Sequence, residues 1–315
     1  MSRLLLAGWF GLCALFGTVQ AQDFDYGLVP QPVAPGVYVL IGKTEDFDTR
    51  NGGNIVNTGF IVDREGVIVI DSGPSRRYGE QLRAAMRRIT PLPPVLVINT
   101  HHHPDHFLGN QAFADVPIAA LPVTRQGIAA EGNAFADNLY RLSGDWLKGT
   151  ELRAPDRDLA AGRLDVAGRR LELVALDGHT GADLVVVDRE SGVVFAGDLV
   201  FHERAPTTPH ADIAHWLAAL NRLEALTREA GFRFLVPGHG PVSRDATPIA
   251  QTRAWLQWLA RRLEDDARAG LDMSEVMRQP LPPAQARLPL AQREFERAVE
   301  HLFPAIEARV LAEKP

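Results

Sequence analysis

The sequence contains one cysteine among its 315 residues. This residue, Cys13, lies in an apolar N-terminal segment that we expect to be cleaved off, so the mature chain would contain no cysteine. The absence of cysteine excludes disulfides, thiolate metal ligands and a thiol nucleophile. The fold must therefore be stabilised by its hydrophobic core alone.

The sequence also lacks a strong excess of one charge. Its formal net charge of -6 gives no support for a nucleic-acid partner. We find no low-complexity segment and no linker long enough to separate a second domain. With 46% hydrophobic and 23% charged residues, the chain is typical of a globular protein that can bury a substantial core.

Residues 1–21 have the pattern of a secretory signal peptide. Arg3 precedes an apolar run over residues 4–16, and residues 18–21 are small enough for cleavage before Gln22. One alternative is an uncleaved membrane anchor, although the run is shorter than the roughly 20 residues that a spanning helix needs. The other is a buried core helix. The signal peptide predicts a periplasmic protein, given a bacterial source, with no stable membrane insertion after cleavage.

Residues 101–106, His-His-His-Pro-Asp-His, contain more potential metal ligands than any other stretch. The preceding residues 94–100 are apolar and β-branched, which predicts a buried strand. Side chains alternate along an extended segment, so His101 and His103 point the same way, whereas His102 points away and is not counted.

The end of this stretch could hold a second ion. Asp105 and His106 are expected to open a short helix that continues to Phe113, so their side chains would project beside the first pair. Imidazole and carboxylate ligands suit zinc, and such sites with an open position are usually catalytic rather than structural.

Further potential ligands follow predicted strands in the second half of the chain. Each lies in a turn that contains glycine, which permits tight backbone conformations. These residues are His179, Asp198 and His239. We expect them to converge with the ligands of residues 101–106.

The order of predicted elements suggests a duplicated architecture. Each half has a strand hairpin, a short apolar strand that ends in an aspartate (Asp71 or Asp198), and then an amphipathic helix. This pattern indicates an α/β fold of the αββα four-layer sandwich type. Asp71 is either the cap of the next helix or a buried hydrogen-bond acceptor that orders the metal loop; we favour the second interpretation.

Two segments are expected to form the walls of a substrate cleft. Residues 44–53 are predicted to be a mobile hairpin loop with Phe47 as its one apolar side chain. Arg204, in the segment 202–210, either receives a substrate carboxylate or is an exposed surface arginine. We expect four other histidines to be structural or solvent-facing: His202, His210, His215 and His301.

The ordered motifs His-x-His-x-Asp-His, Gly-His-Thr, Gly-Asp and Gly-His resemble those of the metallo-β-lactamase superfamily. The resemblance covers roughly residues 36–242. It implies one such domain over residues 22–242. Apolar residues at helical spacing predict that residues 243–315 form a C-terminal helical extension packed on the same domain. Within the superfamily the motifs look most like those of periplasmic zinc metallohydrolases related to sulphur oxidation and quinoprotein relay.

The resemblance also implies a binuclear zinc site. His101, His103 and His179 would bind the first ion, Asp105, His106 and His239 the second, and Asp198 would bridge them. The implied activity is a periplasmic zinc-dependent hydrolase in which a metal-bridged hydroxide attacks a small ester, thioester or lactam. Asp105 would orient the hydroxide and pass a proton to the leaving group.

Two departures from the family pattern affect the expected substrate. Asp198 stands where classical antibiotic-degrading members of two subclasses have cysteine, and an aspartate bridge is similar to glyoxalase II instead. The turn at residues 181–183, Gly-Ala-Asp, differs from the Pro-Gly-His form of those thioesterases, which argues against a glutathione thioester. Two alternatives stay open: a persulfide dioxygenase-like enzyme with one iron, and a non-catalytic accessory protein that binds a quinone or a sulfur compound.

Overall fold

The computed structural model describes residues 24–313. The predicted signal peptide, residues 1–21, lies outside the described residues. Within residues 24–313, none of the helices has the length and apolar character that crossing a membrane would require.

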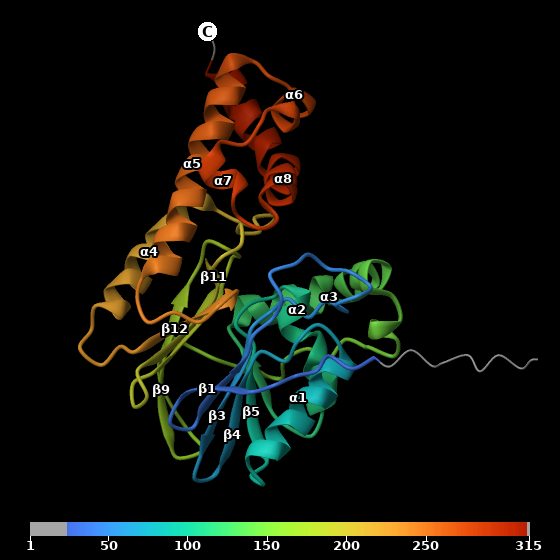
Figure 1. Cartoon of the computed structure of the whole chain (residues 1–315), viewed down its shortest axis with the longest axis vertical. Coiled ribbons are helices and arrows are strands. Elements are labelled where there is room, and N and C mark those ends of the chain that lie inside the picture. The colour runs from blue at the N-terminus through green and yellow to red at the C-terminus, as the bar shows by residue number, and fades with distance from the viewer. Residues whose placement is uncertain (1–23, 314–315) are drawn as a thin grey trace, which may run out of the picture.

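Two sheets pack face to face at the centre of the molecule (Figure 1). The first has the order β1-β2-β3-β4-β5-β6-β7, antiparallel from β1 to β4 and parallel from β4 to β7. Its strands are β1 (Gln31–Ala34), β2 (Val37–Leu40), β3 (Thr58–Asp63), β4 (Gly66–Ile70), β5 (Pro94–Ile98), β6 (Ile118–Ala120) and β7 (Arg157–Asp158).

The second sheet has the order β12-β11-β10-β9-β8. It is antiparallel except for the pair β11 and β12, which is parallel. Its strands are β8 (Gly162–Val166), β9 (Arg169–Leu176), β10 (Asp183–Asp188), β11 (Val193–Phe201) and β12 (Phe234–His239).

Helices cover the outer face of each sheet. Helix α1 packs on the first sheet through Tyr78, Leu82 and Met86, whereas α4 and α5 pack on the second. The helices are α1 (Arg76–Ile89), α2 (Pro104–Phe107), α3 (Pro122–Ser143), α4 (Ile213–Thr227), α5 (Thr247–Ala269), α6 (Met273–Arg278), α7 (Pro283–Ala286) and α8 (Ala291–Ala312), with 3-10 helices at Leu108–Phe113 and Gly144–Leu147.

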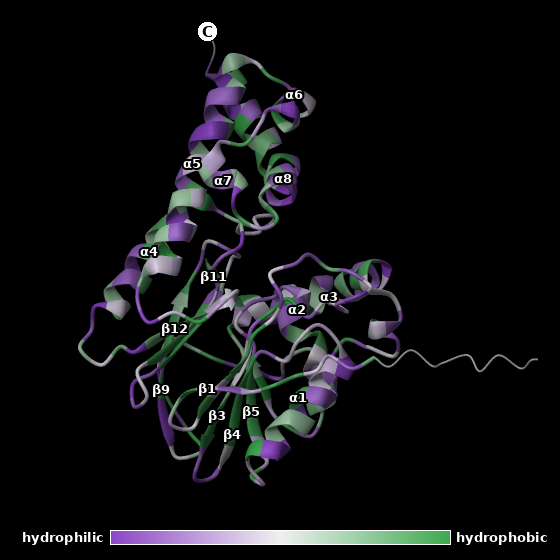
Figure 2. Ribbon diagram, in the orientation of Figure 1, coloured by the Kyte–Doolittle hydropathy of each residue, from purple (hydrophilic) through white to green (hydrophobic). Residues whose placement is uncertain are grey.

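The main core lies between the two sheets. Alternate side chains of the inner strands, such as Ile61, Ile68 and Val186, are fully buried there. In Figure 2 these strands are strongly hydrophobic, whereas the outer helices carry hydrophilic residues on their solvent side. The predicted αββα four-layer sandwich is confirmed.

The C-terminal helices stand beyond one end of the sandwich (Figure 1). Helix α5 starts against α4 and β11 and then pairs with α8, with which it shares a small core. Phe295, Val299 and Phe303 of α8 are buried in that core. One end of α8 returns toward the sandwich, where Arg297 forms an ion pair with Asp46.

Strand β3 begins at Thr58, because the side chain of Asn57 donates to the carbonyls of Pro237 and Gly240 and holds a turn. One strand was predicted to end at Asp198, which was wrong, because that strand, β11, continues to Phe201. Asp198 therefore lies inside β11 and not after it.

Candidate metal centre

Seven predicted ligands come together at one edge of the sandwich. The loop after β5 carries His101 and His103, while α2 carries Asp105 and His106. The other three come from the second sheet: His179 from the β9–β10 loop, Asp198 from β11 and His239 from the end of β12. All seven side chains are buried.

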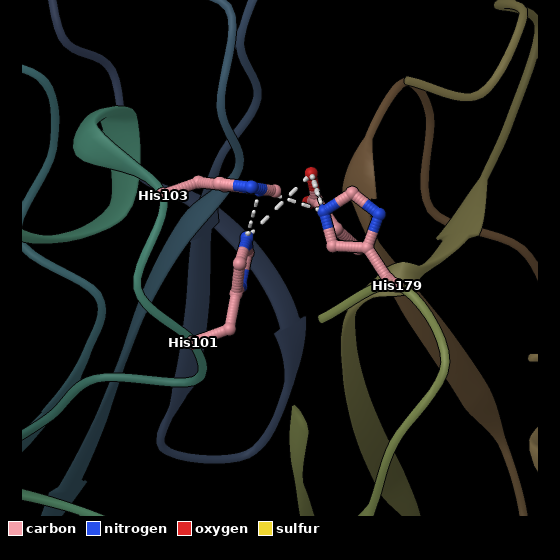
Figure 3. A group of neighbouring side chains, drawn as sticks. His101, His103 and His179 are labelled. Atoms are coloured by element: carbon pink, nitrogen blue, oxygen red, sulfur yellow. Dashed lines mark hydrogen bonds and ion pairs between the residues drawn. The ribbon is translucent and has the colours of Figure 1, made fainter. Parts of the chain in front are cut away.

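The first group consists of His101, His103, His179 and Asp198. Figure 3 shows the three imidazoles pointing toward one another, with His179 facing the other two from the opposite side. The Nδ1 atom of His103 lies 3.1 Å from Nε2 of His101 and 2.8 Å from Nε2 of His179. Oδ2 of Asp198 is 3.4 Å from the same His179 nitrogen.

The second group consists of Asp105, His106 and His239. Asp198 lies between the groups: its Oδ1 is 3.1 Å from Nε2 of His106, and its Oδ2 is 3.1 Å from Nε2 of His239. Oδ2 of Asp105 is 3.4 Å from that His239 nitrogen. The carboxylate of Asp198 is thus within reach of both groups, as a bridging ligand must be.

A bulged segment of β11 aims Asp198 at the centre. The pairing of β11 with β12 shifts register around Gly197, which has a φ of 53°. On the neighbouring strand, Gly238 leaves room for the carboxylate: a Cβ atom there would lie 1.8 Å from Oδ1 of Asp198. Only glycine fits at this position without displacing Asp198.

Asp71 orders the metal loop, as predicted, and the cap of α1 is Ser75 instead. The carboxylate of Asp71 accepts hydrogen bonds from the backbone N–H of Thr100 at 2.8 Å, from the Thr100 hydroxyl at 2.8 Å and from Nδ1 of His106 at 2.7 Å. It connects the end of β4 with both parts of the ligand loop. Asp71 adopts a φ of 58°, which is uncommon for a residue with a side chain.

Hydrogen bonds to the outer nitrogens fix the orientation of four imidazoles. Nδ1 of His106 donates to Asp71, and Nδ1 of His239 donates to the carbonyl of Ile55 at 2.7 Å. Nδ1 of His101 lies 3.0 Å from the Thr100 hydroxyl. The outer nitrogen of His103 is Nε2, and it lies 2.8 Å from Nδ1 of His210. The other nitrogen of each ring faces the centre, where it can bind a metal in its unprotonated form.

This donor set fits a cation. Nε2 of His106 and Oδ1 of Asp198 are buried and have no hydrogen-bond partner, although they face each other. Burial lowers the pKa of His106, but the carboxylates of Asp198, Asp71 and Asp105 raise it more, so it lies well above the ordinary value. The pocket therefore favours positive charge at this point, which one or two metal ions would supply.

The three imidazoles of the first group are held neutral. Burial lowers the pKa of His101 and His103 well below the ordinary value, and it lowers the pKa of His179 to about 3. A neutral imidazole is the form that binds metal. The arrangement can thus hold metal through nitrogen and oxygen atoms.

A cleft of about 360 Å³ opens onto the metal centre. Its apolar lining comes from the segment after β2, from α3 and from the loop after β11. These residues are Phe47, Ile55, Phe135, Leu139, Leu142 and Pro209. Phe47 lies in the cleft as expected, but residues 51–57 of its segment are buried rather than free, because Gly52 packs closely on Trp146.

Arg204 differs from both of its expected roles. It lines the cleft but is only 2% exposed, and its guanidinium pairs with Glu294 of α8 at 3.2 Å. One guanidinium nitrogen also lies 2.9 Å from Nδ1 of His239. The positive charge of Arg204 is therefore opposed by a buried carboxylate and is not free for a substrate.

Several cleft residues were missed. His210 and His301 are exposed, as expected, but they also line the cleft, and the ring of His102 lies near those of His103 and His210. One face of α3 belongs both to a core cluster, in which Leu139 is buried, and to the cleft wall, which Phe135 and Leu142 line. Apolar residues at helical spacing look the same in a core and at a cleft, so the sequence held no signal to separate them.

The amino-acid sequence is similar to those of two kinds of hydrolytic enzyme. It is 24% identical to a linear primary-alkylsulfatase from a Pseudomonas species, a match that covers 75% of this chain and 52% of the relative. It is 25% identical to acyl-coenzyme A thioesterase MBLAC2 from Gallus gallus, covering 59% and 73%. The chain thus spans about half the length of the alkylsulfatase.

The fold is shared with solved structures. A metallo-β-lactamase from Pontibacter korlensis superposes with a TM-score of 0.58 at 24% identity, covering 73% of this chain and 99% of that one. The family model described as the metallo-β-lactamase superfamily matches residues 51–239, which contain all seven candidate ligands. The chain belongs to the metallo-β-lactamase superfamily.

Proposed function

We propose that this chain is a zinc-dependent hydrolase that holds two ions and cleaves a small ester, thioester or lactam. One observation carries the proposal: inward-facing imidazole nitrogens and two carboxylates meet at the floor of a cleft, with Asp198 within 3.1 Å of both His106 and His239. Buried ligands that open onto a substrate-sized cleft are typical of catalytic and not of structural zinc.

The proposed ligand sets follow the two groups. His101, His103 and His179 would hold the first ion, Asp105, His106 and His239 the second, and Asp198 would be shared. When bound, zinc supplies a Lewis acid and lowers the pKa of water from about 15.7 toward about 7.

Asp105 is the proposed proton carrier. Its carboxylate lines the cleft and lies within 4 Å of the ring nitrogens of both His106 and His239. There it can orient the attacking water as a hydrogen-bond acceptor, take its proton and release that proton to the departing alcohol, thiol or amine. The hydrogen bonds from Thr100 to the carboxylate of Asp71 hold the ligand loop in position during this proton transfer.

The relatives support the reaction class. One is named an acyl-coenzyme A thioesterase and another a linear primary-alkylsulfatase. We extend to this chain only what those names share, which is cleavage of an ester-type bond by water.

Metal analysis combined with a substrate screen tests the proposal. Protein purified without added metal should contain close to two zinc ions per chain and hydrolyse at least one of nitrocefin, S-lactoylglutathione and p-nitrophenyl esters. His101→Ala should lose zinc and activity while its far-UV circular dichroism is retained. Turnover retained by that variant would refute the ligand assignment.

The same measurements separate the alternatives. The first group alone can hold one ion, so one iron per chain with no hydrolysis would favour a persulfide dioxygenase-like oxidation. Full metal occupancy with no turnover of any kind would favour a non-catalytic role in binding a quinone or a sulfur compound.

We also propose that the protein acts in the periplasm after removal of residues 1–21. The proposal is supported by the basic residue, apolar run and small residues of that segment. Expression in a bacterial host should give a mature chain that begins at Gln22 and is released with the periplasmic fraction. An intact N-terminus in the cytosolic fraction would contradict it.

A further inference from the structure

One face of α3 forms an apolar wall of the cleft. Phe135, Leu139 and Leu142 line the cleft and are spaced four and three residues apart, which places them on the same side of the helix. Leu142 is 37% exposed and Phe135 is only half-buried, whereas Leu139 between them is 1% exposed. The apolar surface that α3 presents to the cleft therefore comes mainly from Phe135 and Leu142.

The same cleft reaches the metal centre. His103, Asp105, Asp198 and His239 are part of its lining, so an occupant of the apolar wall would also meet the reactive end. The volume of about 360 Å³ lies near the lower limit for small-molecule pockets, which suits one short chain or ring.

On the side of the cleft opposite α3, charged side chains contribute little to substrate recognition. Arg297 of α8 lines the cleft, but its guanidinium contacts Glu294 at 2.9 Å and Asp46 at 3.3 Å. Arg204 pairs with the same Glu294. Two cations thus face two carboxylates, so no net charge is left among these four groups to attract an anionic substrate.

We infer that the substrate is an ester or thioester whose apolar acyl chain lies along Phe135, Leu139 and Leu142. This inference rests on the proposed hydrolase function and names its substrate class. In the reaction, the oxygen of water bonds to the acyl carbon and the bond from that carbon to the alcohol or thiol breaks. The proton from water passes to the leaving group, which gives a free alcohol or thiol and a carboxylic acid.

A chain-length series with the zinc-loaded protein tests the apolar wall. The substrates are p-nitrophenyl acetate, butyrate and hexanoate. Burial of each added methylene should raise kcat/KM about fourfold until the chain fills the cleft. A value of kcat/KM that is flat or falls from acetate to hexanoate would overturn the inference.

Leu142→Ala removes apolar surface from the rim of the wall. We expect the ratio of kcat/KM for hexanoate to that for acetate to fall roughly tenfold, because one side chain in an apolar pocket discriminates at about that level. The matched control is Leu311→Ala, an exposed leucine of α8 outside the cleft, which should leave the ratio unchanged. An unchanged ratio in Leu142→Ala, or equal changes in both variants, would contradict the inference.

A binding measurement separates this inference from the proposed function. Hexanoate should bind the protein more tightly than acetate by calorimetry, and Leu142→Ala should reduce the difference. If this holds while neither esters, S-lactoylglutathione nor nitrocefin is hydrolysed, the acyl-chain site stands and the hydrolase proposal fails. If esters are hydrolysed without chain-length preference, the hydrolase proposal stands and the acyl-chain site is refuted. Absence of both binding and hydrolysis refutes both.

Discussion

Replacement of Gly238 by alanine should disable the metal centre although it replaces none of the proposed ligands. The added Cβ would lie 1.8 Å from Oδ1 of Asp198, whereas real Cβ contacts essentially never fall below 3.0 Å. The carboxylate or β12 must therefore move by at least 1.2 Å, the difference between these two distances. Metal–ligand bonds tolerate displacements of only about 0.2 Å, so Asp198 would no longer reach both groups.

The expected loss follows from that displacement. A misplacement of about 1 Å at a reacting centre costs on the order of 100-fold in rate, and we expect Gly238→Ala to lose about that much kcat/KM. Plasma mass spectrometry should show fewer metal ions per chain. The matched control is Gly231→Ala, because a Cβ there has no heavy atom within 4 Å and the backbone has no positive φ. Wild-type metal content and activity in Gly238→Ala would refute the proposed role of Asp198.

Three further predictions concern the surroundings of the ligands. Asp71→Asn should lower metal affinity about 10- to 100-fold, measured by competition with a chelator, because an amide NH2 would replace Oδ2, the oxygen that accepts from Nδ1 of His106 and from the Thr100 hydroxyl; unchanged affinity would contradict the role of Asp71. His210→Ala should also weaken metal binding, and His210→Gln, which keeps a polar side chain, should restore part of it; equal affinities in both variants would exclude positioning of the first group by His210. In the metal-free protein, His179 has a pKa of about 3, below the ordinary 6.5, so the unfolded chain binds its proton first as pH falls. The corresponding stability is present above pH 6.5 and is lost as pH falls from 6.5 toward 3; urea unfolding at several pH values should show this decrease, and His179→Gln should make it smaller.

Much of the candidate site could be predicted from sequence because its ligands are signalled locally. The run at residues 101–106 follows an apolar strand, His179 follows β9 in a glycine turn, and His239 ends β12 between two glycines. Local chemistry of this kind does not depend on which distant segments pack together. The role of Asp71 could also be predicted, because a carboxylate after a buried strand needs hydrogen-bond donors.

The cleft could not be predicted, since it depends on contacts between distant segments. Arg204 pairs with Glu294, which is 90 residues away along the chain. The position of Asp198 within β11 depends on a register shift against β12 that no local pattern indicates. Likewise, the apolar face of α3 becomes a cleft wall only because α8 and the segment with Phe47 leave it uncovered.

The buried ion pair of Arg204 and Glu294 makes the sandwich depend on the C-terminal helices. Arg204 belongs to the loop after β11, whereas Glu294 belongs to α8, and both side chains are almost fully inaccessible to water. Replacement of Glu294 by a neutral residue, with α8 still in place, would leave the guanidinium of Arg204 buried beside His239 without that carboxylate, at a cost of about 3–5 kcal/mol. A helical tail grafted from another protein would therefore need a carboxylate at the position of Glu294, or a second change at position 204.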